Sequence, residues 1–214
     1  MEGDFPQGDK AQYKPAGYKQ LIYAPKQKLQ DEADLAKTKK TNLEKEYSLW
    51  VLIREQTFHK KKHEGFDPAE LQEITSFGTV QDFWMVYQHM RRPTAMPYGT
   101  NLHVFVKGIK PVWEDPKLVE GARFTLKMPK SHCSKYWEDL LLAMIGEQLP
   151  ENLVAGLVLN LKPQFDKISV WITDSREEKA IAQLKADILK VTQIEEKEIE
   201  YEIFKEVRDK KPVK

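Results

Sequence analysis

Five short stretches of the chain are β-strand candidates, and in three of them, 122–128, 154–162 and 168–173, large apolar residues recur at every second position. The predicted strands span residues 102–106, 122–128, 154–162, 168–173 and 198–204. A further stretch, 49–53, is an uninterrupted apolar run of strand length. Together these segments predict a sheet.

Three other segments show the 3.6-residue period of amphipathic helices. The first begins at Thr79, whose hydroxyl can cap the helix, and has Asp82 in its first turn. The second ends at Gly146, after apolar residues that begin at Tyr136, and the third covers 176–191. Strands interspersed with helices predict an α+β domain with a mainly antiparallel sheet and helices on one face.

The two ends of the chain lack this patterning. Residues 1–45 are polar, contain three prolines and have a single apolar island at 21–23. Such a composition predicts a flexible N-terminal extension. We therefore expect one folded domain at 46–206 and a flexible C-terminal tail at 207–214.

A long charged segment follows the 49–53 run. His59 and His63 stand four residues apart there, the spacing of two metal ligands on one helix face. Gly65 and Pro68 argue against a long helix. A solvated loop is therefore favoured over a metal site, and no metal is predicted.

Composition narrows the class of protein. The chain has 214 residues, 41% of them hydrophobic, which is enough for a packed core. Lys and Arg total 34 against 33 Asp and Glu, so no general attraction for a polyanion is expected. The single cysteine, Cys133, cannot close an internal disulfide, and no run approaches the roughly 20 apolar residues of a membrane span. These features predict a soluble protein of a reducing compartment.

Alternation along the strands places chemically distinctive side chains away from the helices. The core set of 122–128 is Phe124, Leu126 and Met128, which leaves Arg123 on the opposite face. The same argument applied to the next two strands assigns Lys162, Lys167 and Trp171 to that face.

Trp113 and Glu114 complete a set of groups suited to one ligand class. A purine alkylated on its imidazole ring is a cation, which an indole face attracts. A carboxylate accepts two hydrogen bonds from the donor edge of guanine, and cations neutralise a phosphate chain. Taken singly, Trp113 fits a core position, Trp171 an aromatic on a sheet edge, and each cation a solvated charge. Their convergence favours a binding site.

Five strings of the chain, in order, resemble the eukaryotic translation initiation factor 4E family, the messenger-RNA cap-binding proteins, over about 47–204. They are Thr79-Val80-Gln81-Asp82-Phe83-Trp84, Gly108-Ile109-Lys110-Pro111-Val112-Trp113-Glu114-Asp115, Gly121-Ala122-Arg123-Phe124, Tyr136-Trp137 with Ile145-Gly146-Glu147, and Asp166-Lys167-Ile168-Ser169-Val170-Trp171.

The resemblance implies a curved, mainly antiparallel sheet with three helices on the convex face and 7-methylguanosine held on the concave face. It assigns Trp113 to stacking, Glu114 to reading guanine and Trp171 to the side of the added methyl group. It assigns the cap phosphates to Arg123, Lys162 and Lys167. The cap is then the ligand, and no cofactor is implied.

The resemblance also implies that a short helix of a 4G-like scaffold protein, or of a 4E-binding protein, docks on the convex face. The residues at the corresponding positions are Val80, Trp84, Asp139 and Leu142. Helical periodicity alone predicts that Trp84 is a core residue, so the two lines of reasoning disagree there.

Several positions depart from the family pattern. The first stacking residue is normally a tryptophan after the first strand, but none occurs between Trp50 and Trp84. Phe66 is the expected replacement and Phe58 the alternative; a phenyl ring binds a cation more weakly than an indole does. The enlarged Lys-rich loop and the Arg91-Arg92-Pro93 segment are similar to those of divergent protist isoforms, such as those of trypanosomatids.

The leading hypothesis is a non-enzymatic cap reader that brings messenger RNA to the initiation machinery as a cytoplasmic monomer, with the nucleus as a second location. One alternative is an adaptor or translational repressor with weak or specialised cap binding. A third hypothesis is an enzyme that uses Glu114 and Asp115 as acid and base. The absence of a Ser/His/Asp set or a glycine-rich phosphate loop favours recognition.

Overall fold

The computed structural model describes residues 39–53, 71–150 and 152–210. Seven strands form one sheet in the order β2-β1-β3-β5-β6-β4-β7, and every pairing between them is antiparallel. The strands are β1 (Asn42–Ile53), β2 (Gln72–Thr79), β3 (Thr100–Val106), β4 (Ala122–Met128), β5 (Val154–Leu161), β6 (Asp166–Ile172) and β7 (Ile199–Ile203). The sheet is curved, as the resemblance implied.

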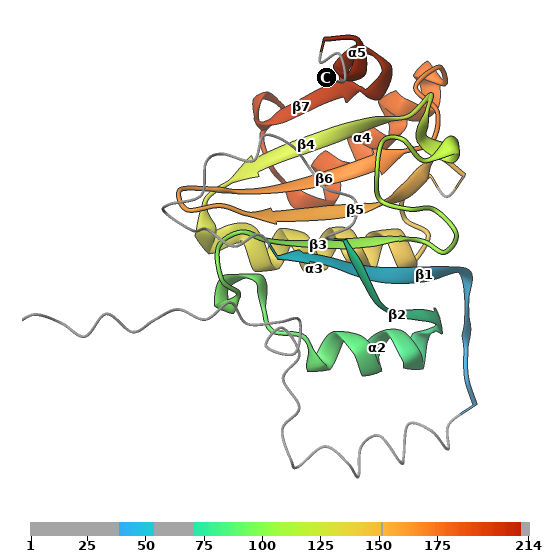
Figure 1. Cartoon of the computed structure of the whole chain (residues 1–214), viewed down its shortest axis with the longest axis vertical. Coiled ribbons are helices and arrows are strands. Elements are labelled where there is room, and N and C mark those ends of the chain that lie inside the picture. The colour runs from blue at the N-terminus through green and yellow to red at the C-terminus, as the bar shows by residue number, and fades with distance from the viewer. Residues whose placement is uncertain (1–38, 54–70, 151, 211–214) are drawn as a thin grey trace, which may run out of the picture.

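Within the described residues, three longer α-helices and one short one accompany the sheet. They are α2 (Val80–His89), α3 (Lys130–Ile145), α4 (Glu178–Thr192) and α5 (Phe204–Lys210). Figure 1 views the sheet from its open face, with α3 and α4 behind it and α2 beside β2. The predicted α+β architecture with helices on the convex face is confirmed. None of the helices within the described ranges is long and apolar enough to span a bilayer.

The core lies between the sheet and the helices because every second strand residue faces them. Leu157, Val170 and Phe124 are cross-strand neighbours with at most 2% of their surface exposed. Trp137 and Leu140 of α3 belong to the same buried cluster. Fully burying one such side chain contributes about 1.5–3 kcal/mol, so this layer supplies much of the stability.

The first two strands differ from the sequence prediction. β1 begins at Asn42, seven residues before the apolar run, so residues 42–45 of the expected extension belong to this strand, and Asn42 pairs with Thr79 of β2. β2 was not predicted as a strand, because Phe77 is its single buried residue. It is an edge strand bonded to β1 alone, and such a strand needs few apolar side chains.

The C-terminal part also differs. β7 ends at Ile203, and α5 occupies residues that were expected to form the end of the domain and the start of a flexible tail. Phe204, at the start of α5, is fully buried, which anchors the helix to the domain. Helix α3 begins at Lys130, earlier than the prediction. The apolar stripe did not reveal this start, because the first turn of the helix is mostly polar.

Thr79 caps α2 as predicted: its hydroxyl accepts a hydrogen bond from the backbone N–H of Asp82 at 3.1 Å. The candidate first stacking residues, Phe66 and Phe58, lie outside the described residues. The same holds for the His59 and His63 pair.

Candidate functional site

The open face of the sheet is built of rows of side chains that run across the strands, because directly paired residues point to the same side. The tryptophan row is Ser48, Phe105, Gly156, Trp171, Arg123 and Glu202. The histidine row is Trp50, His103, Val158, Ser169, Thr125 and Glu200. The lysine row is Leu52, Asn101, Asn160, Lys167 and Lys127.

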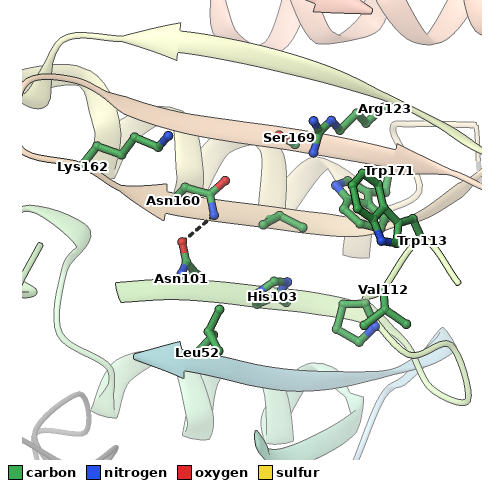
Figure 2. Close-up of a pocket in the computed structure, with 12 residues that line it drawn as sticks. Leu52, Asn101, His103, Val112, Trp113, Arg123, Asn160, Lys162, Ser169 and Trp171 are labelled. Atoms are coloured by element: carbon green, nitrogen blue, oxygen red, sulfur yellow. Dashed lines mark hydrogen bonds between the residues drawn. The ribbon is translucent and has the colours of Figure 1, made fainter. Parts of the chain in front are cut away.

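A pocket of about 260 Å³ lies on this face (Figure 2). Its lining residues are Leu52, Asn101, His103, Pro111, Val112, Trp113, Arg123, Val158, Asn160, Lys162, Ser169 and Trp171. Four residues singled out from the sequence are therefore brought together, namely Trp113, Trp171, Arg123 and Lys162. Lys167 lies on the adjoining lysine row, and Glu114 is exposed beside Trp113.

Trp171 is held in place by other aromatic rings. The centroid of its ring lies 4.6 Å from that of Phe204 and 5.5 Å from that of Phe105. Gly156 stands between Phe105 and Trp171 in the row, and a Cβ there would lie 2.5 Å from the Phe105 ring. The missing side chain lets the two rings meet, and 7% of Trp171 stays exposed. Its predicted face is thus correct, but the ring is a wall of the pocket rather than an open surface.

The loop that carries Trp113 is tied down from two sides. Both carboxylate oxygens of Asp115 accept backbone hydrogen bonds, from Lys110 at 2.8 Å and Lys117 at 2.9 Å. Arg208 of α5 donates to the carbonyl oxygens of Trp113, at 2.8 Å, and Val119, at 2.6 Å. Sequence reasoning missed Arg208 because the residue fell in the expected flexible tail. Its bonds link α5 to the position of the Trp113 backbone.

Two cations on the open side of the sheet form ion pairs with carboxylates of β7. Arg123 contacts Glu202 Oε2 through Nη2 at 2.6 Å and Nε at 2.8 Å. Lys127 bonds Glu200 at 2.7 Å, and this ion pair lowers the pKa of the Glu200 carboxyl. Both acids went unnoticed in the sequence, although alternation along β7 points Glu200 and Glu202 the same way.

Lys167 lies within this group of charges. Burial lowers the pKa of its ammonium group, and repulsion from Lys127, Lys162 and Arg123 acts in the same direction, whereas Glu200 opposes the shift. The described part of the face therefore holds four clustered cations, two of which already have an acidic partner.

His103 lies on the pocket floor and has 4% of its surface exposed. Neither ring nitrogen has a hydrogen-bond partner in the part of the chain that the structure describes. Burial lowers the pKa of this imidazole to about 3, so the ring is neutral at physiological pH. A buried neutral histidine makes stability depend on pH, because the unfolded chain binds a proton that the folded chain does not.

We predict that His103→Gln reduces the loss of stability on acidification. Above the unfolded pKa of about 6.5 the group contributes no pH dependence, and stability falls as pH drops from there toward 3. Between pH 7 and 5 the wild type should lose roughly 2 kcal/mol more than the variant. Urea unfolding at both pH values measures this difference. Equal losses in the two proteins would contradict the neutral buried state.

The convex side presents a second cluster of predicted residues. Trp84 is 40% exposed and packs edge-on against Phe83, which is buried and takes the core position instead. The core prediction from periodicity was therefore wrong for Trp84. A pocket of about 250 Å³ beside Trp84 is lined from both α2 and α3, including Arg92 and Glu138, which form an ion pair.

The other convex-face candidates lie on the same two helices. Val80 starts α2, and Leu142 of α3 is partly buried. Asp139, also on α3, pairs with Lys135 at 2.5 Å. Among the described residues, no group of three or more His, Cys, Asp or Glu side chains could hold a metal ion.

Comparison with known proteins places the chain among initiation factors. The family model described as "Eukaryotic initiation factor 4E" matches residues 42–214. The translation initiation factor NCBP of rice (Oryza sativa subsp. japonica) is 31% identical over 168 residues, which cover 74% of this chain and 72% of that protein. Factor 4E1 of Drosophila melanogaster is 36% identical over 116 residues, which cover 52% of this chain and 45% of that protein.

Solved structures show the same relationship. The complex of C. elegans eIF4E-3 with the 4E-binding protein Mextli and a cap analog matches with a TM-score of 0.71 and 28% identity, over 82% of this chain and 99% of that chain. Ascaris suum eIF4E-3 with m7G cap matches with a TM-score of 0.67 and 30% identity, over 77% of this chain and 92% of that chain. These relatives are plant and animal proteins, and the likeness to protist isoforms stays a prediction.

Proposed function

Because the chain belongs to the eukaryotic initiation factor 4E family, we propose that it binds the 7-methylguanosine cap of messenger RNA on the open face of its sheet. The observation that carries this proposal is the pocket in which Trp113 and Trp171 lie at one end and Lys162 at the other (Figure 2). Aromatic rings beside a row of cations match a positively charged base with a phosphate tail.

The methylated base is proposed to stack on Trp113, with Trp171 beside the methyl group. A cation over an indole gains about 0.5–2 kcal/mol, and plain guanine lacks this term. Glu114 follows Trp113 on the anchored loop, so its exposed carboxylate can accept from the base. The opposite face of the base is assigned to Phe66, with Phe58 as the alternative, and this assignment stays a prediction.

The phosphate chain is proposed to follow Arg123, Lys167 and Lys162. Lys127 pairs with Lys167 across β4 and β6 and therefore adds a fourth cation to this group. The sequence argument did not include it. Glu202 and Glu200 already engage Arg123 and Lys127, so a phosphate must compete with a carboxylate at both positions. No cofactor is needed for this recognition.

The convex face is proposed to dock a short helix of a 4G-like scaffold or a 4E-binding protein. An exposed Trp84 beside a pocket between α2 and α3 fits an apolar anchor in a groove, and Val80, Leu142 and Asp139 complete the surface. The C. elegans structure that matches this chain is itself a complex with a 4E-binding protein. Through such a scaffold the protein would recruit capped messenger RNA to the initiation machinery, as a cytoplasmic monomer with the nucleus as a second location.

A second candidate function is an adaptor or repressor with weak or specialised cap binding. The ion pairs Arg123–Glu202 and Lys127–Glu200 favour it, because they reduce the net positive charge available to phosphates. The affinities for 7-methyl-GTP and for GTP separate the two. Strong preference for the methylated nucleotide supports the cap reader, and similar weak binding to both supports the adaptor.

Recognition rather than turnover is the proposed activity. An enzyme that used Glu114 and Asp115 as acid and base would need both carboxylates free, yet both oxygens of Asp115 accept backbone N–H groups. The proposed domain is 46–206, with flexible segments on either side. In the structure β1 starts before residue 46, at Asn42, and α5 ends after residue 206, at Lys210.

We predict that Glu114→Gln abolishes most of the preference for guanine. The amide keeps one acceptor but turns a donor toward the donors of the base, so 7-methyl-GTP affinity should fall at least tenfold, since a charged hydrogen bond contributes about 1.5–3 kcal/mol. Quenching of tryptophan fluorescence measures it. Glu120→Gln, an exposed acid after the same loop, is the matched control. Unchanged affinity in the Glu114 variant refutes the assignment.

We predict that Glu202→Gln strengthens binding of 7-methyl-GTP about threefold to tenfold, because removing the competing charge frees Arg123 for a phosphate, an effect of about 1 kcal/mol. Affinity for 7-methylguanosine, the nucleoside without phosphates, should stay the same. Titrations of both ligands at two salt concentrations test this. Glu196→Gln, an exposed acid paired with Lys185, is the control. Equal gains for both ligands would show that the phosphates are not involved.

We predict that Trp84→Ala weakens capture of a 4E-binding peptide by more than tenfold, as truncation of a buried interface tryptophan costs about 2 kcal/mol or more. Binding of 7-methyl-GTP should be unchanged, since Trp84 lies on the other face of the sheet. Calorimetry with each ligand tests the separation. Tyr98→Ala, which removes another exposed aromatic ring, is the control. Loss of both activities would instead identify Trp84 as structural.

A further inference from the structure

Among the described residues that line the pocket, His103 is the buried side chain that has both a donor and an acceptor position unused. Asn160 donates to Asn101 at 2.5 Å, and Ser169 and Thr125 share a hydrogen bond of 3.0 Å. Both ring nitrogens of His103 lack a partner within the described part of the chain. Buried polar groups are rarely left unsatisfied, and one that faces a pocket is expected to meet its partner in a ligand.

The chemistry of this group restricts what it can bind. In the described structure the neighbours of His103 are Phe105, Trp50 and Val158, and burial alone keeps the imidazole neutral. A neutral imidazole presents one N–H donor and one acceptor nitrogen. It therefore suits a group that both donates and accepts, such as a hydroxyl, and it offers no charge to a phosphate.

The position of His103 between two other rows indicates which part of a nucleotide it meets. Residues two apart on a strand are separated by about 6.6–6.8 Å, so the three rows divide the face at that spacing. Trp171 lies in the tryptophan row and Lys167 in the lysine row, with the histidine row between them. In Figure 2 His103 lies on β3 between Asn101 and the end of the pocket that holds Trp113. Lys162 lies at the opposite end of the pocket.

A nucleotide that lies with its base at the tryptophans and its phosphates at Lys167 and Lys162 passes its sugar over the histidine row. Arg123 starts in the tryptophan row, but its guanidinium extends toward Ser169 in Figure 2 and so points toward such a phosphate chain. Ser169, the other polar residue that lines the pocket from this row, is already bonded to Thr125. The indole nitrogen of Trp171 also finds no partner among the described residues, but it belongs to the tryptophan row and can only donate.

We propose that His103 hydrogen-bonds a ribose hydroxyl of the capped nucleoside and makes the pocket prefer ribose over deoxyribose. The proposal rests on the proposed cap binding and adds a residue that distinguishes the sugar. His103 then determines specificity, while Trp113 and Glu114 recognise the base.

The test compares 7-methyl-GTP with its 2′-deoxy and 3′-deoxy analogues by tryptophan fluorescence titration. The wild type should bind one of the deoxy analogues about threefold to tenfold more weakly, as expected for one neutral hydrogen bond. His103→Leu should bind that analogue and 7-methyl-GTP equally, and His103→Gln should restore part of the difference. His132→Leu, which changes an exposed histidine on α3, is the matched control and should discriminate like the wild type.

The outcomes separate the two proposals. If the wild type does not bind 7-methyl-GTP, the proposed function fails. If it binds 7-methyl-GTP and both deoxy analogues equally, or if His103→Leu discriminates as well as the wild type, the role of His103 is overturned. Should the leucine variant fail to fold, nitrogen NMR of the wild-type imidazole decides: a ring-nitrogen shift with 7-methyl-GTP that is lost with the deoxy analogue supports the contact, and identical shifts overturn it.

Discussion

Antiparallel pairing of strands whose buried faces carry apolar side chains is the constraint on which the rest of the molecule depends. Each core residue, such as Val170 or Phe124, forces its neighbours in the chain to point to the open face. Trp171 and Arg123 are such neighbours, and the pairing of their strands places them side by side. The same register that builds the core therefore assembles the ligand face.

The C-terminal elements convert this face into a shaped pocket. β7 adds two carboxylates at the edge of the sheet, and α5 places Phe204 against Trp171 and Arg208 on the Trp113 loop. These contacts fix the aromatic end of the pocket before any ligand arrives, and such preorganisation lowers the entropic cost of binding. Two of the cations on this face, Arg123 and Lys127, are balanced by these acids.

The two faces of the sheet keep their interactions apart. The pocket of the open face is lined mainly by the open-face rows and the Trp113 loop, whereas the exposed ring of Trp84 and the pocket between α2 and α3 lie on the helical side. A partner bound to the helices need not contact the nucleotide. This separation suits a protein that joins a nucleic-acid end to another protein.

The sequence by itself determined the strands with clear alternation and the face of each: Arg123, Lys162, Lys167 and Trp171 could be placed because period two is a local property. It missed β2, whose polar residues leave no pattern, and misjudged Trp84, because periodicity cannot tell a core ring from an exposed one. Only the tertiary structure paired Glu202 with Arg123, set Arg208 on the Trp113 loop and, within the described residues, left the His103 ring without a hydrogen-bond partner. These contacts join residues far apart in the chain, and strand order, which no local pattern encodes, decides them.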